Sequence, residues 1–308
     1  MKKCFIYIFL FGFVTVNLFG QSVRIGETIQ LTNKSDGYFM SPKISPDGKI
    51  FFSSQGYKGI FYLEKETKRI ININDELGAG YEFTFSPDGK NVIYRSDRYI
   101  NGLKYSTLKE QNLTTKEVRI LQEESRHMDV PQVLNDGKIV YGIDDRLQIL
   151  ASDRVSKVDI TLLNEPVVKA VNNEIIIYNN GIRRTVQPQG ERYYVWTSLS
   201  PDKTKLLFYA VGKGTFISDL NGKILVELGD IRSPQWSPNG NWISYMLDED
   251  DGEIVLSSDI KIISHDGKIS HQITSTDQIK EIYPVWNDSN LVYADSDGII
   301  YITYLIFE

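Results

Sequence analysis

The residues best suited to metal or proton-transfer chemistry are three histidines, His127, His265 and His271. His265 and His271 flank a predicted two-residue hairpin turn. Because successive side chains along a strand point to opposite faces, this spacing predicts that the two rings point to opposite faces of the hairpin. A shared metal site is therefore disfavoured, and we interpret both histidines as polar surface positions.

Other chemical motifs are weak in this sequence. The acidic run at 248–253 suggests calcium, but the EF-hand pattern places a first oxygen ligand where this chain has Leu247. A solvated hairpin tip is the favoured interpretation of the run. Cys4 is the only cysteine, and the chain has no G-x-S-x-G elbow, H-E-x-x-H pair or phosphate-binding glycine loop. We therefore predict no catalytic residue, no bound metal and no cofactor.

A second kind of candidate is a set of aromatic and basic residues placed just before strands that recur along the chain. Aromatic and arginine side chains are enriched at binding hot spots. Arg192 and Arg232 are the stronger candidates, because arginine is rarely buried without a partner. For the tyrosines the alternative is packing between repeated units, and for His127 it is a solvated loop. The predicted ligand-binding residues are Tyr38, Tyr81, His127, Arg192, Tyr194, Arg232 and Tyr283.

A repeated turn followed by an apolar strand must position these candidates. The turn reads SPDG at 45–48 and 86–89 and SPNG at 237–240, with reduced copies elsewhere. Proline fixes φ, Asp or Asn bonds its own backbone, and glycine takes a positive φ. The apolar strands end in Phe52, Tyr94, Tyr141, Tyr178, Phe208, Tyr245 and Tyr293. Their mean spacing of about 40 residues is typical of one four-stranded propeller blade.

The predicted fold is an all-β propeller of four-stranded blades. Seven blades are favoured because the aromatic position recurs seven times, and helical periodicity is absent. Six blades are the alternative, because the step from Tyr178 to Phe208 is short and 145–190 could form one distorted blade. The segment 27–32 resembles the predicted outer strand at 270–274. We therefore expect the N-terminal strand to complete the last blade and close the ring.

The first twenty residues have the pattern of a secretory signal peptide. Lys2 and Lys3 precede a short apolar run that ends near Gly20, and Asn17 makes the run too short for a membrane anchor. Cleavage would leave 21–308 as one propeller domain with 32 basic and 40 acidic residues and no cysteine. We expect a periplasmic or secreted monomer without disulfides or a membrane span. The acidic balance argues against a nucleic-acid partner.

The clearest copy of the repeat is SPQWSPNG at 233–240, which fits the pattern P-x-aromatic-S-P-[DN]-G. This pattern resembles the repeat of TolB-type β-propellers, and the resemblance covers most of 24–308. This resemblance implies a propeller that binds partner proteins of the cell envelope, or a propeller that precedes a hydrolase domain. We expect this chain to lack both the N-terminal domain of TolB and a hydrolase domain. The similar oligogalacturonate-lyase propeller implies channel chemistry with a metal held largely by histidines.

Two hypotheses for function follow from these patterns. The leading one is a non-catalytic scaffold of the cell envelope that binds a protein segment or a glycan at the mouth of the central channel. The alternative is an enzyme of the carbohydrate-lyase or hydrolase type with a metal in the channel. The small number of histidines disfavours the enzyme, because such a metal site needs several that converge on the channel.

Overall fold

The turns of the repeat are held by one recurring set of side-chain hydrogen bonds. In the computed structural model, which describes 22–144, 146–171, 173–250, 255–276 and 279–308, Ser45 Oγ donates to Asp47 Oδ1 at 2.5 Å. The same oxygen accepts the Lys49 amide at 3.1 Å, and Gly48 adopts a φ of 79°. Equivalent bonds occur at Ser86, Ser200 and Ser237. This local chemistry reverses the chain after the inner strand of four blades.

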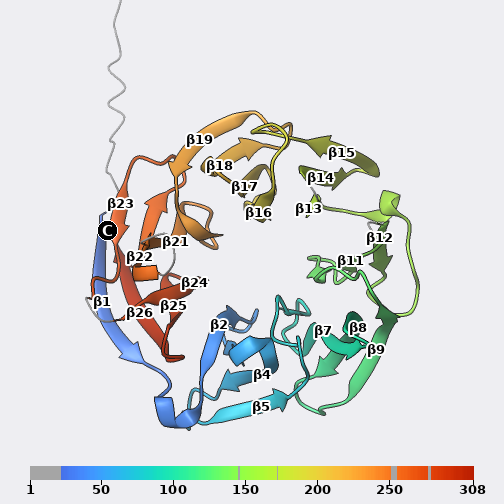
Figure 1. Cartoon of the computed structure of the whole chain (residues 1–308), viewed down its shortest axis with the longest axis horizontal. Coiled ribbons are helices and arrows are strands. Elements are labelled where there is room, and N and C mark those ends of the chain that lie inside the picture. Colours follow the sequence, from blue (N-terminus) through green and yellow to red (C-terminus); the bar gives the residue numbers. More distant parts are fainter. Residues whose placement is uncertain (1–21, 145, 172, 251–254, 277–278) are drawn as a thin grey trace, which may run out of the picture.

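Within the described residues, 26 strands form seven antiparallel sheets arranged as a ring around a central channel (Figure 1). The first sheet contains β2 (Phe39–Ile44), β3 (Ile50–Ser54), β4 (Lys58–Leu63) and β5 (Ile70–Asn74). The second contains β6 (Thr84–Phe85), β7 (Asn91–Ile100), β8 (Leu103–Asn112) and β9 (Val118–Ser125). In the first six sheets the first strand in the chain lies nearest the channel, and in the seventh β24 takes this place while β1 lies at the outer rim (Figure 1).

The third and fourth sheets have three described strands each. They are β10 (Gln132–Val133), β11 (Ile139–Ile143) and β12 (Arg146–Leu150), then β13 (Val167–Val171), β14 (Glu174–Asn179) and β15 (Ile182–Val186). The segment between these two sheets is irregular apart from the short 3-10 helix η3 (Ile160–Leu162). Two further 3-10 helices, η1 (Lys34–Asp36) and η2 (Gln55–Tyr57), lie in loops near the start of the chain.

The remaining sheets are four-stranded. The fifth contains β16 (Tyr194–Leu199), β17 (Lys205–Ala210), β18 (Gly214–Asp219) and β19 (Ile224–Gly229). The sixth contains β20 (Arg232–Trp236), β21 (Trp242–Asp250), β22 (Val255–Ser264) and β23 (Ser270–Gln272). The seventh contains β24 (Glu281–Asn287), β25 (Asn290–Asp295), β26 (Ile300–Phe307) and the N-terminal β1 (Val23–Gln30).

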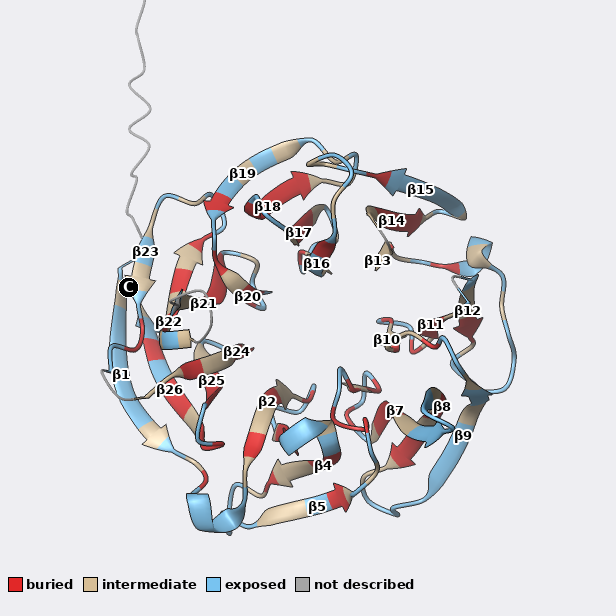
Figure 2. Ribbon diagram, in the orientation of Figure 1, coloured by how far each residue is buried: buried red, intermediate tan, exposed pale blue. Residues whose placement is uncertain are grey.

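The seven recurring aromatic residues mark the seven blades. Each lies in the second strand of its sheet, and none is more than 5% exposed. Apolar side chains of neighbouring sheets pack between these strands, as Phe51 and Tyr94 do. Figure 2 shows the burial on the middle strands and the exposure of outer strands such as β1, β9 and β15. Seven blades are confirmed, and the six-blade alternative is wrong because 132–150 and 167–186 form separate sheets.

The N-terminal strand closes the ring, as the sequence predicted. β1 pairs antiparallel with β26, from Val23 opposite Phe307 to Gln30 opposite Tyr301. Beyond the strand, the Leu31 amide donates to Ile300 O at 2.8 Å, and the Ile300 amide donates to Thr32 Oγ1 at 2.9 Å. Thr32 is fully buried. The N-terminal and C-terminal segments are therefore joined by a ladder of hydrogen bonds that a β-bulge between Ile25 and Thr28 interrupts.

The predicted signal peptide at 1–20 lies outside the described residues. None of the helices in the described part of the chain has the length and apolar character needed to cross a membrane.

Ring closure yields a deletion test. A protein that starts at residue 34 should unfold at a much lower temperature than one that starts at residue 21, because β26 loses its partner strand. Thermal unfolding followed by circular dichroism measures this difference. An unchanged melting temperature would contradict closure by β1.

A point variant tests the same contact with less disruption. Thr32→Val leaves the buried Ile300 amide without its acceptor, so we expect a loss of about 1–3 kcal/mol in the free energy of unfolding. Thr185→Val is the matched control, because Thr185 is an exposed strand residue on β15. We expect little change in the control.

Candidate binding site at the channel mouth

The inner strands carry a repeated β-bulge near one end of the channel. The register shifts by one residue in β2, β16, β20 and β24. The bulged residues have left-handed φ values: Ser41 (51°), Trp196 (49°), Ser233 (50°) and Tyr283 (57°). Non-glycine residues rarely adopt this conformation, and bulges re-aim the side chains around them. These strands begin earlier than the sequence indicated, so Tyr194, Arg232 and Tyr283 lie within strands rather than before them.

Three of the predicted tyrosines gather at this mouth with a fourth that the sequence analysis missed. Tyr57, in η2, lies edge-to-face against Tyr81, with ring centroids 5.0 Å apart. Burial raises the pKa of Tyr283 to about 12, and Tyr57 and Tyr38 add to the rise. Tyr38 packs against the turn at Gly298. We call Tyr38, Tyr57, Tyr81 and Tyr283 the tyrosine cluster.

The loop that carries Tyr57 has an unusual backbone. Gly56, Tyr57 and Gly59 all have positive φ, at 70°, 58° and 71°. The Tyr57 carbonyl accepts the Gly80 amide at 3.1 Å, so this loop is tied to the segment that carries Tyr81. Gly80 is needed for the approach, because a Cβ there would lie 1.8 Å from Ser53 Oγ. A tyrosine between two glycines in the loop after β3 was the available sequence signal.

Two charged contacts adjoin the tyrosine cluster. The Arg95 guanidinium lies 5.7 Å from the centre of the Tyr81 ring, a cation–π distance. Lys43 Nζ lies 2.7 Å from Glu82 Oε2 and holds the pKa of that carboxyl below its usual range. Burial raises the pKa of Tyr81, and the neighbouring Glu82 adds to this effect. Tyr81 therefore stays neutral at physiological pH and presents an uncharged ring.

The other predicted residues lie apart from the tyrosine cluster or have structural contacts. Tyr194 is only 4% exposed; its hydroxyl donates to Gly190 O at 2.6 Å, and its ring packs against Phe208. It belongs to the core, as the packing alternative held, so we leave it out of the proposed site. Arg192 Nε donates to Gln189 O at 2.9 Å in the same loop. His127 is exposed beside a separate cavity of about 530 Å³ that Arg126 also lines.

Arg232 is engaged by an acidic residue. Its guanidinium lies 3.7 Å from Asp248, whose side chain is 5% exposed and also accepts a hydrogen bond from Ser258. The expectation that the run at 248–253 is a solvated tip is therefore wrong at Asp248, because β21 extends through this residue and pairs it with β22. Residues 251–253 lie outside the described part of the chain.

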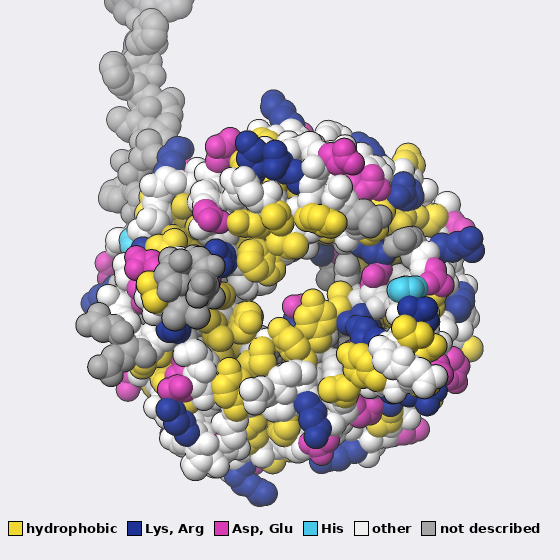
Figure 3. Space-filling view, viewed as in Figure 1, with side chains coloured by type: hydrophobic (Ala, Val, Ile, Leu, Met, Phe, Trp, Pro, Cys, Tyr) yellow, Lys and Arg dark blue, Asp and Glu magenta, His cyan; other side chains and the backbone are white. Residues whose placement is uncertain are grey.

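Two cavities line the channel. One of about 350 Å³ is bordered by side chains of the second to fifth blades, among them Tyr81, Arg95 and Lys169. The other, of about 360 Å³, lies nearer the SPDG-type turns and is bordered by Phe83, Trp236 and Trp286. Figure 3 shows hydrophobic side chains gathered around the open channel. An apolar rim with a few charged groups is the usual composition of a binding pocket.

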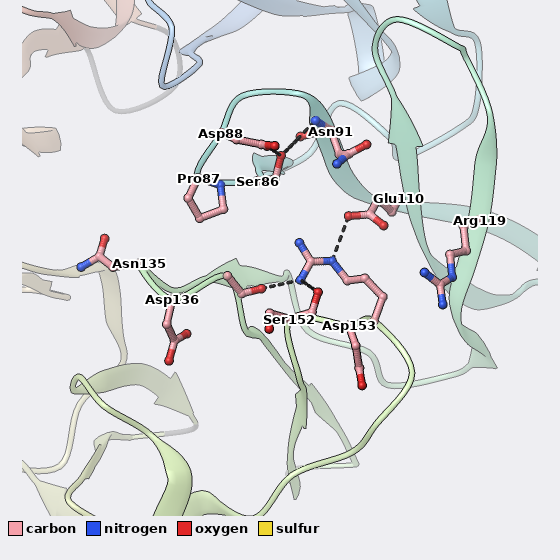
Figure 4. Close-up of a pocket in the computed structure, with 12 residues that line it drawn as sticks. Ser86, Pro87, Asp88, Asn91, Glu110, Arg119, Asn135, Asp136, Ser152 and Asp153 are labelled. Carbon is pink, nitrogen blue, oxygen red and sulfur yellow. Dashed lines mark hydrogen bonds and ion pairs between the residues drawn. The ribbon is translucent and has the colours of Figure 1, made fainter.

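A polar groove of about 490 Å³ lies between the second and third blades, beside the SPDG-type turns (Figure 4). Arg154 points into it from the third blade and pairs with Glu110 at 2.9 Å, and it also donates to the Gly137 carbonyl. Both side chains of the pair are about nine-tenths buried. Since their charges satisfy each other, we interpret this groove as a structural contact between blades.

The described residues contain no group of three or more His, Cys, Asp and Glu side chains that could hold a metal ion. The ring of His271 packs near Trp242, with centroids 5.6 Å apart, while His265 Nδ1 lies 3.4 Å from Asn241 O. Across the hairpin His271 lies opposite Ile262.

Comparison with known proteins shows the β-propeller fold and does not settle a family. No family model and no curated protein matches this sequence. Oligogalacturonate lyase from Vibrio parahaemolyticus is similar over 92% of this chain and 97% of its own, with a TM-score of 0.64 and 12% identity. An oligogalacturonate lyase in complex with manganese covers 86% of this chain and 76% of its own, with a TM-score of 0.50 and 12% identity. TolB from Acinetobacter baumannii is 21% identical over 75% of this chain and 53% of its own, with a TM-score of 0.47.

The raised pKa of Tyr283 predicts a pH dependence of stability. A folded-state pKa of about 12 lies above the unfolded value of about 10, so this hydroxyl contributes stability below pH 10 that is lost as the pH rises toward 12. Other buried tyrosines act in the same direction, so the comparison must be between variants. Tyr283→Phe should show a shallower fall in the free energy of unfolding between pH 10 and 12, measured by urea denaturation. An identical pH profile would contradict the burial of this hydroxyl.

Proposed function

We propose that this protein is a non-catalytic binding scaffold that takes a protein segment at the mouth of its channel. The observation that carries the proposal is the tyrosine cluster, in which Tyr57, on a loop of unusual backbone, forms an edge-to-face pair with Tyr81. Backbone strain in non-glycine residues costs about 1–3 kcal/mol and is concentrated at functional sites. Within this pair Tyr81 remains 42% exposed. Such rings bury a large area at little cost in side-chain entropy.

The inner strands support a peptide as the occupant. Each is the edge strand of its sheet, so its outward backbone groups face the channel rather than another strand. Extended peptides use such groups for main-chain hydrogen bonds, while pockets for side chains give specificity. A glycan, which also stacks on aromatic rings, is the other ligand class to be tested.

We place this function in the periplasm or outside the cell. The support is the signal-like pattern of 1–20. N-terminal sequencing of protein recovered from the periplasmic or culture fraction tests this placement, and recovery with residues 1–20 intact in the cytoplasm would contradict it.

No described contact favours the alternative of a metal-dependent lyase or hydrolase. The likeness to an oligogalacturonate lyase in complex with manganese concerns the fold, at 12% identity. Elemental analysis of the purified protein tests the alternative directly. Stoichiometric bound transition metal would favour the enzyme over the scaffold.

The binding proposal is tested with a displayed library of random peptides and a glycan array. Selected ligands should bind Tyr81→Ala at least tenfold more weakly than the native protein, because this change removes an aromatic contact at the mouth. The matched control is Tyr304→Ala on β26, since Tyr304 is 41% exposed and lies away from the channel. Calorimetric titration measures both affinities.

The same titrations distinguish a site at the mouth from a site elsewhere, and a peptide from a glycan. Equal losses in the two variants would contradict a site at the mouth, and selection of glycans alone would replace the peptide by a glycan. Arg232→Ala is a poor probe, because it removes the cation beside the buried carboxylate of Asp248 and should destabilise the fold.

A further inference from the structure

Arg95 is a buried cation with an unused hydrogen-bonding edge. It lies on β7, is 6% exposed, and borders the 350 Å³ cavity in the channel wall. Nη1 donates to the carbonyl of Met128 on the next blade, and the guanidinium faces the Tyr81 ring. Nε is buried and has no hydrogen-bond partner among the described residues. Nη2 also has no described protein partner, and a guanidinium N–H is a strong donor to a carboxylate.

No described carboxylate lies within 4.0 Å of this guanidinium to balance its charge. The one acidic residue among those described that border the same cavity is Asp129, and its carboxylate is paired with Lys169 Nζ. That pair fits only because position 142 is glycine, since a Cβ there would lie 1.9 Å from Asp129 Oδ2. Two cations and one carboxylate border the cavity, so its described side chains carry one excess positive charge. Buried charges are normally paired, because an unpaired one is costly to desolvate.

The rest of the cavity wall is mainly apolar. Val130, Val140, Leu147 and Val168 border it. Thr197 also borders it, and its buried hydroxyl has no hydrogen-bond partner among the described residues. A volume of about 350 Å³ is within the range of about 300–1,000 Å³ found for small-ligand pockets. One anionic group on a short apolar stem complements these features, whereas a fully hydrated inorganic anion does not.

We infer that this cavity binds a carboxylate carried on a short apolar stem, with the guanidinium of Arg95 as the anion-binding group. The inference rests on the proposed function, because Tyr81 belongs both to the channel mouth and to the cavity. The carboxylate has two possible sources, a free short-chain organic acid or the C-terminus of a bound peptide. Both present the same group to Arg95.

Direct titration separates the two sources. Butyrate is compared with butyramide, and N-acetyl-Ala-Leu-Val with its C-terminal amide, by calorimetry and by thermal shift at constant ionic strength. At least one carboxylate should bind tenfold or more tightly than its amide. Binding of butyrate alone identifies a free acid, and binding of the peptide acid alone identifies a C-terminus. Equal affinity of acids and amides, or binding of inorganic phosphate with equal affinity, would overturn the inference.

Arg95→Met tests the residue itself. Methionine keeps an unbranched apolar stem and removes the charge, so carboxylate affinity should fall at least tenfold. The melting temperature without ligand should not fall, because an unbalanced buried cation is removed. Arg98→Met is the matched control on the same strand, since Arg98 is exposed and pairs with Glu124; it should bind carboxylate normally. A folded Arg95→Met protein that binds butyrate or the peptide acid normally would overturn the assignment.

The titrations remain decisive if Arg95→Met does not fold, because the acid–amide comparison uses the native protein. They also separate this inference from the proposed function. Carboxylate binding without peptide selection at the mouth would uphold the cavity and contradict the scaffold, while the reverse would uphold the scaffold and contradict the cavity.

Discussion

The pairing of β1 with β26 is the contact on which the rest of the structure depends. Each blade buries its middle strands only against neighbouring blades, so an open array would leave two apolar faces in water. The N-terminal strand removes this defect by completing the seventh sheet. Closure also fixes the ring of inner strands, and with it the positions of the loops that bring Tyr57, Tyr81 and Tyr283 together.

Two arginines between blades differ in whether a carboxylate balances their charge. The Glu110–Arg154 pair is balanced and joins two blades through complementary charges. Arg95 also bridges two blades, through the Met128 carbonyl, but it has no described carboxylate beside it. Natural proteins give up stability at sites that serve a ligand. The contrast between these two arginines is why we assign a structural role to one and a binding role to the other.

The fold was predictable because its cause is local and repeated. In four of the turns a serine bonds an Asp or Asn two residues later, and these bonds depend only on neighbours in sequence. The turns and the regularly spaced aromatic residues could therefore be recognised without coordinates. The weakly patterned third and fourth blades were harder, because their turns are reduced and their described strands number three each. The closing strand was recognisable from its likeness to another outer strand.

The site was predictable only in part, because it depends on contacts between blades. Tyr38, Tyr81 and Tyr283 were identified from their predicted place just before inner strands, but Tyr194 at an equivalent place turns into the core beside Phe208. Tyr57 was missed because its loop joins two other strands of the first blade. Arg95 was missed because nothing in the sequence of β7 shows that its guanidinium lies beside Tyr81 without a counter-charge.

The most direct test of this account is the Nε–H resonance of Arg95 in protein labelled with ¹⁵N-arginine, assigned by its loss in Arg95→Met. We expect this resonance to shift on addition of butyrate or of the peptide acid and to be unmoved by the corresponding amide, while the Arg98 resonance stays in place. An Arg95 resonance that is unmoved by either carboxylate at saturating concentration would contradict the account.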